Sequence, residues 1–183
     1  MSDYLASLIR EDLEKLSEIV VDRAPASGKL LPGERRRVAI LFLDLSGFTA
    51  LSERLDHEVL HRLTGGLMKA LARVVEAHGG YVDKFEGDRI MALFGARAAF
   101  ENDCSRAVAS GLRMLETIEE INGILQSCSP GGAPTRLSAR VGISFGSVTV
   151  GPDPSGHLTA MGEEVSMASR LEETARVGTV QVA

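Results

Sequence analysis

An acidic residue directly follows a short, strongly apolar run, and this feature constrains the chain more than any other. All six residues from Val38 to Leu43 are apolar, which is typical of a buried strand. The run leads straight into Asp44, and residues 46–49 then begin a new amphipathic pattern that predicts a helix. Because an unpaired carboxylate beside a buried strand is costly, Asp44 is expected to bind backbone N–H groups, a cation or a metal.

A second acidic turn decides how Asp44 is interpreted. Free amides at the start of the helix after Asp44 would form an anion site, although Asp44 alone could simply cap that helix. Residues 81–95 are typical of two short strands around Glu86-Gly87-Asp88, a hairpin with its acidic residues at the tip. Asp88 is therefore the expected partner of Asp44.

Length and composition indicate one folded domain with a short extension. The chain has 183 residues, and its 44% apolar content excludes a disordered chain. No apolar run approaches the roughly 20 residues that span a bilayer, and the acidic N-terminus does not resemble a signal peptide, so a cytoplasmic location without a membrane span is expected. The net charge of −5 gives no support to nucleic-acid binding. The basic run Arg35-Arg36-Arg37 is interpreted as a solvated start of a strand.

The periodicity of the sequence predicts an ordered series of elements. Residues 3–22 carry one apolar stripe typical of an amphipathic helix, and a linker by composition follows. The remaining elements are a strand at 36–45, a helical stretch at 47–78 that is either whole or divided near Asp56, a hairpin at 80–95, a helix at 102–127, strands at 137–145 and 147–150 joined by Gly146, a short segment at 158–161, a helix from Gly162 to about 176, and a strand at 179–182.

The order of these elements predicts an α+β fold of the ferredoxin-like split βαβ type. In such a sheet the third strand lies antiparallel between the first two, which are parallel to each other. The end of the first strand then lies beside the start of the third. Asp44 and Asp88 would consequently face the same small region, although they are far apart in sequence.

Three stretches of the chain resemble the catalytic domain of the class III adenylate and guanylate cyclases, in the bacterial and soluble adenylate cyclase-like branch. They run from Phe42 to Thr49, from Lys84 to Asp88 and from Gly162 to Glu172. The resemblance extends from about Arg37 to the end of the chain. It implies a sandwich of helices on an antiparallel-containing sheet, and a homodimer with each nucleotide site built from both chains. Residues 1–33 would then be an N-terminal helix and linker, and residues 34–183 the cyclase domain.

The resemblance also implies the metal and phosphate ligands. Asp44 and Asp88 would hold two Mg²⁺ or Mn²⁺ ions, with help from the backbone carbonyl of Leu45. The implied reaction converts ATP to 3′,5′-cyclic AMP and pyrophosphate for signal transduction, by attack of the ribose 3′-hydroxyl on the α-phosphate. The phosphates would bind the backbone amides of Gly47, Phe48 and Thr49.

Further positions that match the family would read the base and stabilise the transition state. Lys84 and Thr159 correspond to the residues that contact the purine edge, and an ammonium suits adenine N1, a bare acceptor, better than protonated guanine N1. Without the motif, Lys84 would be interpreted as an exposed lysine on a strand. Arg170 matches the arginine that stabilises charge on the α-phosphate.

The sequence departs from the family pattern at two places. Ser166 stands where the family has an asparagine that is expected to orient the ribose, and this difference lowers the expected activity. The family domain normally continues past Val182, so a fragment of a longer protein with further domains is expected. An adenylate cyclase is the first interpretation. The alternatives are a degenerate domain that binds nucleotide or a partner and regulates without turnover, and a domain that keeps only the fold, with Asp44 and Asp88 as turn caps.

Overall fold

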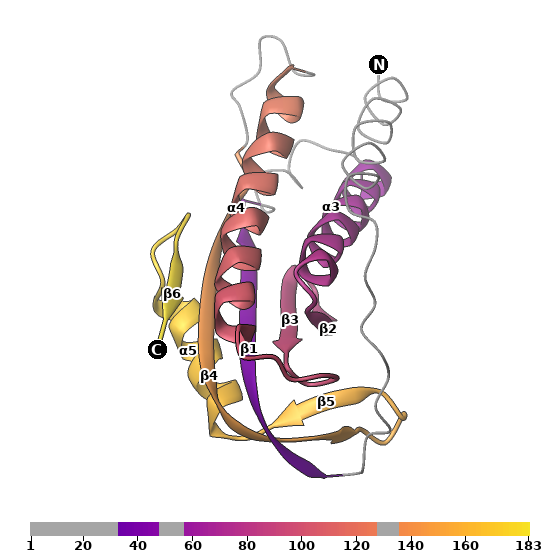
Figure 1. Ribbon diagram of the computed structural model, residues 1–183. Helices are drawn as coiled ribbons and strands as arrows, with labels where there is room; N and C mark the ends of the chain where they lie inside the picture. Colours follow the sequence, from indigo (N-terminus) through magenta and orange to yellow (C-terminus); the bar gives the residue numbers. More distant parts are fainter. Residues whose placement is uncertain (1–32, 48–56, 128–135) are drawn as a thin grey trace.

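The fold was analysed in a computed structural model that describes residues 33–47, 57–127 and 136–183 (Figure 1). The helix expected at 3–22, the linker and the division near Asp56 lie outside these residues. The described elements are β1 (Glu34–Ser46), α3 (His57–Ala77), β2 (Tyr81–Glu86), β3 (Arg89–Phe94), α4 (Asp103–Ser127), β4 (Ser138–Pro152), β5 (Leu158–Met161), α5 (Glu163–Thr174) and β6 (Val180–Val182).

The strands form one mixed sheet with the predicted split βαβ arrangement. The pairing order is β2-β3-β1-β4-β5, and β6 pairs with β4 in parallel. Strand β3 lies antiparallel between β1 and β2, with Asp44 opposite Arg89. The end of β1 therefore lies beside the start of β3, as the order of elements predicts.

Helices cover both faces of this sheet because its strands alternate between two cores. From β1, Leu41 and Leu43 point into the core under α3 and α4, whereas Ile40 and Phe42 point into a second core that includes Ala168 of α5. Figure 1 shows α3 and α4 running alongside each other on one face. With helices packed on a mixed sheet, the α+β class predicted from the sequence is confirmed.

Strand β4 is one continuous strand, so the prediction of two strands joined at Gly146 was wrong. Residues 138–150 of β4 pair with β1 in an unbroken antiparallel register. A Cβ atom on Gly146 would lie 2.5 Å from Oε1 of Glu164, a residue of α5. The glycine therefore faces the Glu164 side chain within a continuous strand and does not mark a turn.

The two strands at opposite ends of the pairing order come into contact. Thr159 of β5 donates a hydrogen bond to Asp83 of β2, and Leu158 and Tyr81 pack against the same core. Figure 1 shows β1 and β4 curving together, with β5 crossing beneath the other strands. This curvature brings β5 to β2 and joins two elements that sequence order alone would not place together.

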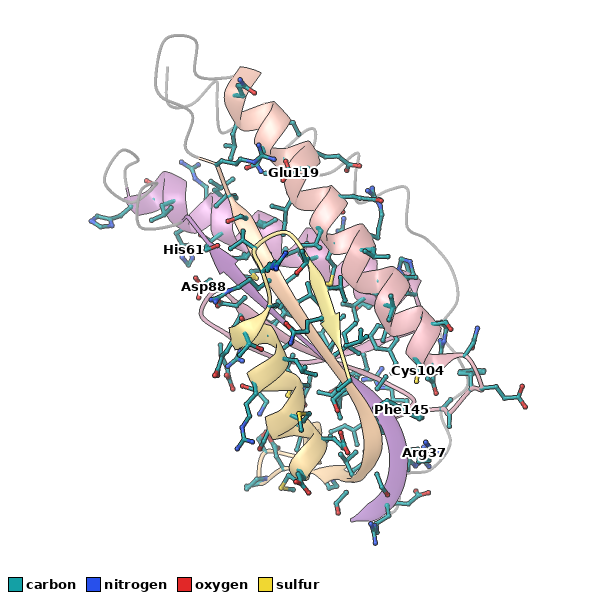
Figure 2. The ribbon with its side chains drawn as sticks, turned by 90° about the vertical axis from the view of Figure 1, so that its left-hand side faces the viewer. Arg37, His61, Asp88, Cys104, Glu119 and Phe145 are labelled. Atoms are coloured by element: carbon teal, nitrogen blue, oxygen red, sulfur yellow. The ribbon has the colours of Figure 1, made fainter. Side chains whose placement is uncertain are left out.

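The basic run at the start of β1 is largely solvated, as expected, because Arg35 and Arg37 are exposed and only Arg36 is half-buried. Arg36 donates to the carbonyl oxygen of Ala96 at 3.1 Å. The Arg37 guanidinium lies 4.6 Å from the centre of the Phe145 ring, and Figure 2 shows these two residues together. Across residues 33–47, 57–127 and 136–183, no helix is long and apolar enough to cross a membrane.

Candidate functional site

The two predicted metal-binding acids occupy adjacent backbone segments. Asp44 stands near the end of β1, and the next residue, Leu45, donates its N–H to the carbonyl oxygen of Asp88 at 3.3 Å. Asp88 is partly exposed in the turn between β2 and β3, and Figure 2 shows it at the rim of the molecule. The topology therefore brings together the two segments that the sequence placed at one site.

An arginine that sequence reasoning missed pairs with the first of these acids. Arg140 of β4 lies opposite Asp44 in the strand register, and its Nη2 is 3.1 Å from Asp44 Oδ2. Both side chains are partly buried, so their attraction is less screened than at an open surface. Only the register of β1 and β4 could have revealed this partner, because nothing in the sequence near Arg140 points to Asp44.

Glu172 connects this acidic end of β1 to helix α5. It is 2% exposed and accepts a hydrogen bond from Arg89 Nη2 at 2.7 Å, while Arg140 Nε lies 3.7 Å away. Burial raises the pKa of Glu172, and the nearby Arg89 guanidinium opposes that effect. Arg89 also donates to Ser169 of α5 at 2.8 Å. Asp44, Arg140, Glu172 and Arg89 thus form a charge cluster between the sheet and α5.

Glu172→Ala is expected to lower the free energy of unfolding by about 3 kcal/mol, because it leaves two partly buried guanidinium groups without their buried partner. The matched control is Glu173→Ala, at the next position, since the Glu173 side chain is 62% exposed and 4.0 Å from Arg89. An ion pair at the surface contributes under about 1 kcal/mol to the free energy of unfolding. Equal destabilisation of the two variants in urea unfolding would contradict this account of the cluster.

The two predicted base-reading residues lie around one buried carboxylate. Thr159 Oγ1 donates to Asp83 Oδ2 at 3.0 Å, and Lys84 Nζ is 3.8 Å from the same oxygen. Burial raises the pKa of Asp83, and the hydrogen bond from Thr159 opposes that effect. Sequence reasoning missed Asp83, because burial along β2 does not alternate: a register shift lies between Val82 and Lys84, and Asp83 is buried while the three residues after it are exposed.

The predicted phosphate-binding turn is described only at its first residue. Gly47 has a φ of 102°, and a Cβ atom there would lie 2.6 Å from the carbonyl oxygen of Arg136, so the turn requires glycine. Phe48 and Thr49 lie outside the described residues. Leu45, the predicted carbonyl ligand, has a buried side chain in the core under α3 and α4.

The predicted transition-state residues share an exposed face of α5. Ser166 and Arg170 are both exposed and stand four positions apart, which places them on one side of the helix. Within the described parts of the chain, neither side chain is hydrogen-bonded or ion-paired to Asp44 or Asp88. Within a single chain, the predicted site residues therefore fall into three groups: the acidic end of β1, the pair around Asp83 and an exposed face of α5.

The acids suit a divalent ion with oxygen ligands. Two carboxylates and a backbone carbonyl are the donors that Mg²⁺ prefers, and Mg²⁺ usually takes one or two carboxylates, with water or substrate phosphates completing its shell. Residues 33–47, 57–127 and 136–183 contain no cluster of three or more His, Cys, Asp or Glu side chains placed to hold a metal. The carboxylates of Asp44 and Asp88 and the Leu45 carbonyl are therefore donors of the kind that Mg²⁺ accepts.

Comparison with known proteins assigns a family and a set of structural neighbours. Residues 32–183 match the family described as the adenylate and guanylate cyclase catalytic domain. The adenylyl cyclase CyaB from P. aeruginosa is 31% identical with a TM-score of 0.73, and 84% of this chain aligns with 79% of that one. The guanylyl cyclase Cya2 is 33% identical with a TM-score of 0.72, over 84% of this chain and 77% of that one.

Curated relatives of similar identity are longer proteins. An adenylate cyclase of Anabaena cylindrica is 31% identical over 140 residues, which are 75% of this chain and 27% of that protein. Adenylate cyclase 1 of Rhizobium meliloti is 30% identical over 141 residues, 75% of this chain and 21% of that protein. The chain thus spans about a quarter of the length of these relatives.

Proposed function

Since the chain belongs to the adenylate and guanylate cyclase catalytic-domain family, we propose that it converts ATP to 3′,5′-cyclic AMP and pyrophosphate in signal transduction. The observation that carries the proposal is the backbone hydrogen bond from Leu45 to Asp88, which supports a shared metal site for Asp44 and Asp88. The test is cyclic nucleotide formation from ATP and GTP with Mg²⁺ or Mn²⁺.

The choice of ATP rests on individual residues, because a solved adenylyl and a solved guanylyl cyclase resemble this chain almost equally. Lys84 is 46% exposed and carries three N–H donors. Adenine N1 accepts such a donor, whereas guanine N1 carries its own proton and would oppose one. Thr159 lies beside Lys84 and supplies the second contact to the base.

Each residue of the proposed site has a defined task. Asp44, Asp88 and the Leu45 carbonyl would hold two Mg²⁺ or Mn²⁺ ions, and these ions would supply activation of the 3′-hydroxyl and charge neutralisation for pyrophosphate. Arg140 orients the Asp44 carboxylate through their ion pair. The backbone amides of Gly47, Phe48 and Thr49 bind phosphate oxygens, and Arg170 stabilises the charge that develops on the α-phosphate.

The proposed site is completed by a second copy of the chain. Arg170 and Ser166 lie on an exposed face of α5, where they are available to a partner. In the proposed homodimer, Asp44 and Asp88 of one protomer meet Lys84, Thr159 and Arg170 of the other. We also propose that residues 1–33 form a helix and linker leading into the catalytic domain at 34–183, and that the full-length protein carries further domains.

Ser166→Asn is expected to raise the rate on ATP by one to two orders of magnitude, with nucleotide affinity nearly unchanged. A hydrogen-bond donor that acts mainly on the transition state lowers the activation free energy by roughly 2.7–4 kcal/mol, and the shorter serine hydroxyl supplies part of that stabilisation. Because Ser166 is exposed, the larger amide fits without displacing a core residue. Steady-state kinetics and nucleotide binding measure the two quantities.

The matched control for this variant is Ser155→Asn, an exposed serine in the loop between β4 and β5. It should leave the rate on ATP unchanged. An intact dimer in which Ser166→Asn has an unchanged or lower rate would show that Ser166 does not limit turnover.

A degenerate domain that binds nucleotide or a partner without turnover is the second candidate function. Ser166 favours it, because this serine stands where the family has a ribose-orienting asparagine. The two functions are distinguished by measuring ATP binding and cyclic AMP formation on one sample with Mn²⁺. Binding without product, in wild type and in Ser166→Asn alike, would favour the degenerate domain.

A further inference from the structure

Asp83 is the most buried acid near the proposed base-reading residues. Its side chain is 0% exposed, and Oδ2 receives the Thr159 hydroxyl at 3.0 Å. In the part of the chain that the structure describes, Oδ1 has no hydrogen-bond partner, although His157 Nε2 lies 3.6 Å from it. A buried carboxylate with half of its acceptors unused costs free energy. A purely structural bond to Thr159 would be made more cheaply by a neutral side chain.

The contact with Asp83 determines how the Thr159 hydroxyl can be used. A threonine hydroxyl has one hydrogen to donate and two lone pairs to accept, whereas an ionised carboxylate can only accept. The hydrogen of Thr159 must therefore point at Asp83 Oδ2. Only the lone pairs of Thr159 Oγ1 remain for a ligand, so towards a base this hydroxyl acts as an acceptor.

A donor also lies near the same carboxylate oxygen. Lys84 Nζ lies 3.8 Å from Asp83 Oδ2. Asp83 is itself held in place, because His157 Nε2 is hydrogen-bonded to the Asp83 backbone carbonyl and lies 3.0 Å from the Tyr81 hydroxyl. These contacts tie the β4–β5 loop to β2. An ammonium donor and a hydroxyl acceptor therefore lie near one carboxylate oxygen, on two strands that are distant in sequence.

We propose that Asp83 is a positioning residue that makes the site select adenine, by holding the Thr159 hydroxyl as an acceptor next to the Lys84 donor. The edge of adenine presents an amino donor beside the bare acceptor N1, and both match this pair. Guanine presents a carbonyl acceptor beside a protonated N1, and both conflict with it. The inference rests on the proposed nucleotide substrate and extends it from Lys84 and Thr159 to a residue that touches neither base nor phosphate.

The test is a double-mutant cycle on the ratio of kcat/KM for ATP to that for GTP. Thr159→Val removes the hydroxyl and should lower the ratio roughly tenfold, within the range for one base-reading hydrogen bond. Asp83→Asn keeps the shape of the side chain, but its amide can donate to Thr159 Oγ1 and free the hydroxyl to rotate. Asp83→Asn should lower the ratio by a similar factor. The ratio of the double variant should be no lower than that of Thr159→Val alone.

Two further variants separate this effect from a general loss of structure or charge. Glu86→Gln removes the exposed acid that lies 4.0 Å from Lys84 Nζ and should leave the ratio unchanged. Asp83→Ala removes the acceptor altogether and should lower the ratio at least as much as Asp83→Asn. Thermal melting of each variant shows whether it is folded. A structural role of Asp83 would lower both kcat/KM values together and leave their ratio constant.

Competition between ATP and GTP for binding gives a readout that requires no turnover. Wild-type protein should bind ATP more tightly than GTP. Asp83→Asn should reduce this difference in affinity only while Thr159 is present. A ratio that is unchanged in Asp83→Asn, or that falls again when Asp83→Asn is added to Thr159→Val, would overturn the inference. Wild-type protein that prefers ATP in binding through Asp83 but forms no cyclic nucleotide would contradict the proposed function and support the inference.

Discussion

Replacing Asp44 with alanine is expected to lower cyclic AMP formation by about 10³-fold or more, and Asp88→Ala should do the same. Bound metal ions contribute several kcal/mol of transition-state stabilisation, and each 1.36 kcal/mol is a factor of ten in rate. The two segments meet through the hydrogen bond from Leu45 to Asp88, so both acids are expected to bind the same metal ions, and neither is expected to replace the other. The measurement is the initial rate of cyclic AMP formation from ATP at saturating Mn²⁺.

The controls for these variants address charge and folding. Glu101→Ala removes an exposed acid from the turn before α4 and should leave the rate unchanged. Asp44→Ala also leaves Arg140 without its 3.1 Å partner, so its stability must be measured, whereas Asp88→Ala does not disturb that pair. A folded Asp88→Ala variant with near wild-type turnover would remove the two-metal site from the account.

Mixing two inactive variants, Asp44→Ala and Arg170→Ala, is expected to restore about a quarter of wild-type activity. In a two-fold symmetric dimer, half of the molecules in an equal mixture are heterodimers, and each has one intact site of two. The two residues stand on different elements, because Asp44 lies near the end of β1 whereas Arg170 lies on the exposed face of α5. Activity of the mixture is measured against each variant alone at the same total concentration.

Heterodimer formation must be shown independently, for example by copurification of two differently tagged chains. As a negative control, Asp44→Ala mixed with Asp88→Ala should stay inactive, because both substitutions fall in the same half of the site. Proven heterodimers of Asp44→Ala and Arg170→Ala without recovered activity would place all of these residues in one protomer's site.

Local patterns were sufficient to predict most of the described elements and the position of the paired acids, although not the continuity of β4. The apolar run before Asp44 and the acidic hairpin at Asp88 are visible in the sequence, and the split βαβ topology then places their segments together. The roles proposed for Ser166, Arg170, Lys84 and Thr159 come from the family resemblance, since composition and periodicity say nothing about them. Those roles remain predictions, and the structure supplies only their positions.

The rest of the site could not be predicted because it depends on contacts between distant segments. Arg140 meets Asp44 through the β1–β4 register, and Asp83 meets Thr159 only because β1 and β4 curve and bring β5 to β2. The prediction of a turn at Gly146 was wrong for a related reason. A glycine that faces a packed side chain inside a strand and a glycine that forms a turn look the same in a sequence.

Product formation by the purified protein, with ATP and GTP assayed side by side over a range of Mn²⁺ concentrations, tests the central claim most directly. The account predicts that cyclic AMP is formed, that its rate rises with Mn²⁺ and vanishes with a chelator, and that ATP is used in strong preference to GTP. No cyclic nucleotide from either substrate, or cyclic GMP as the main product, would contradict it.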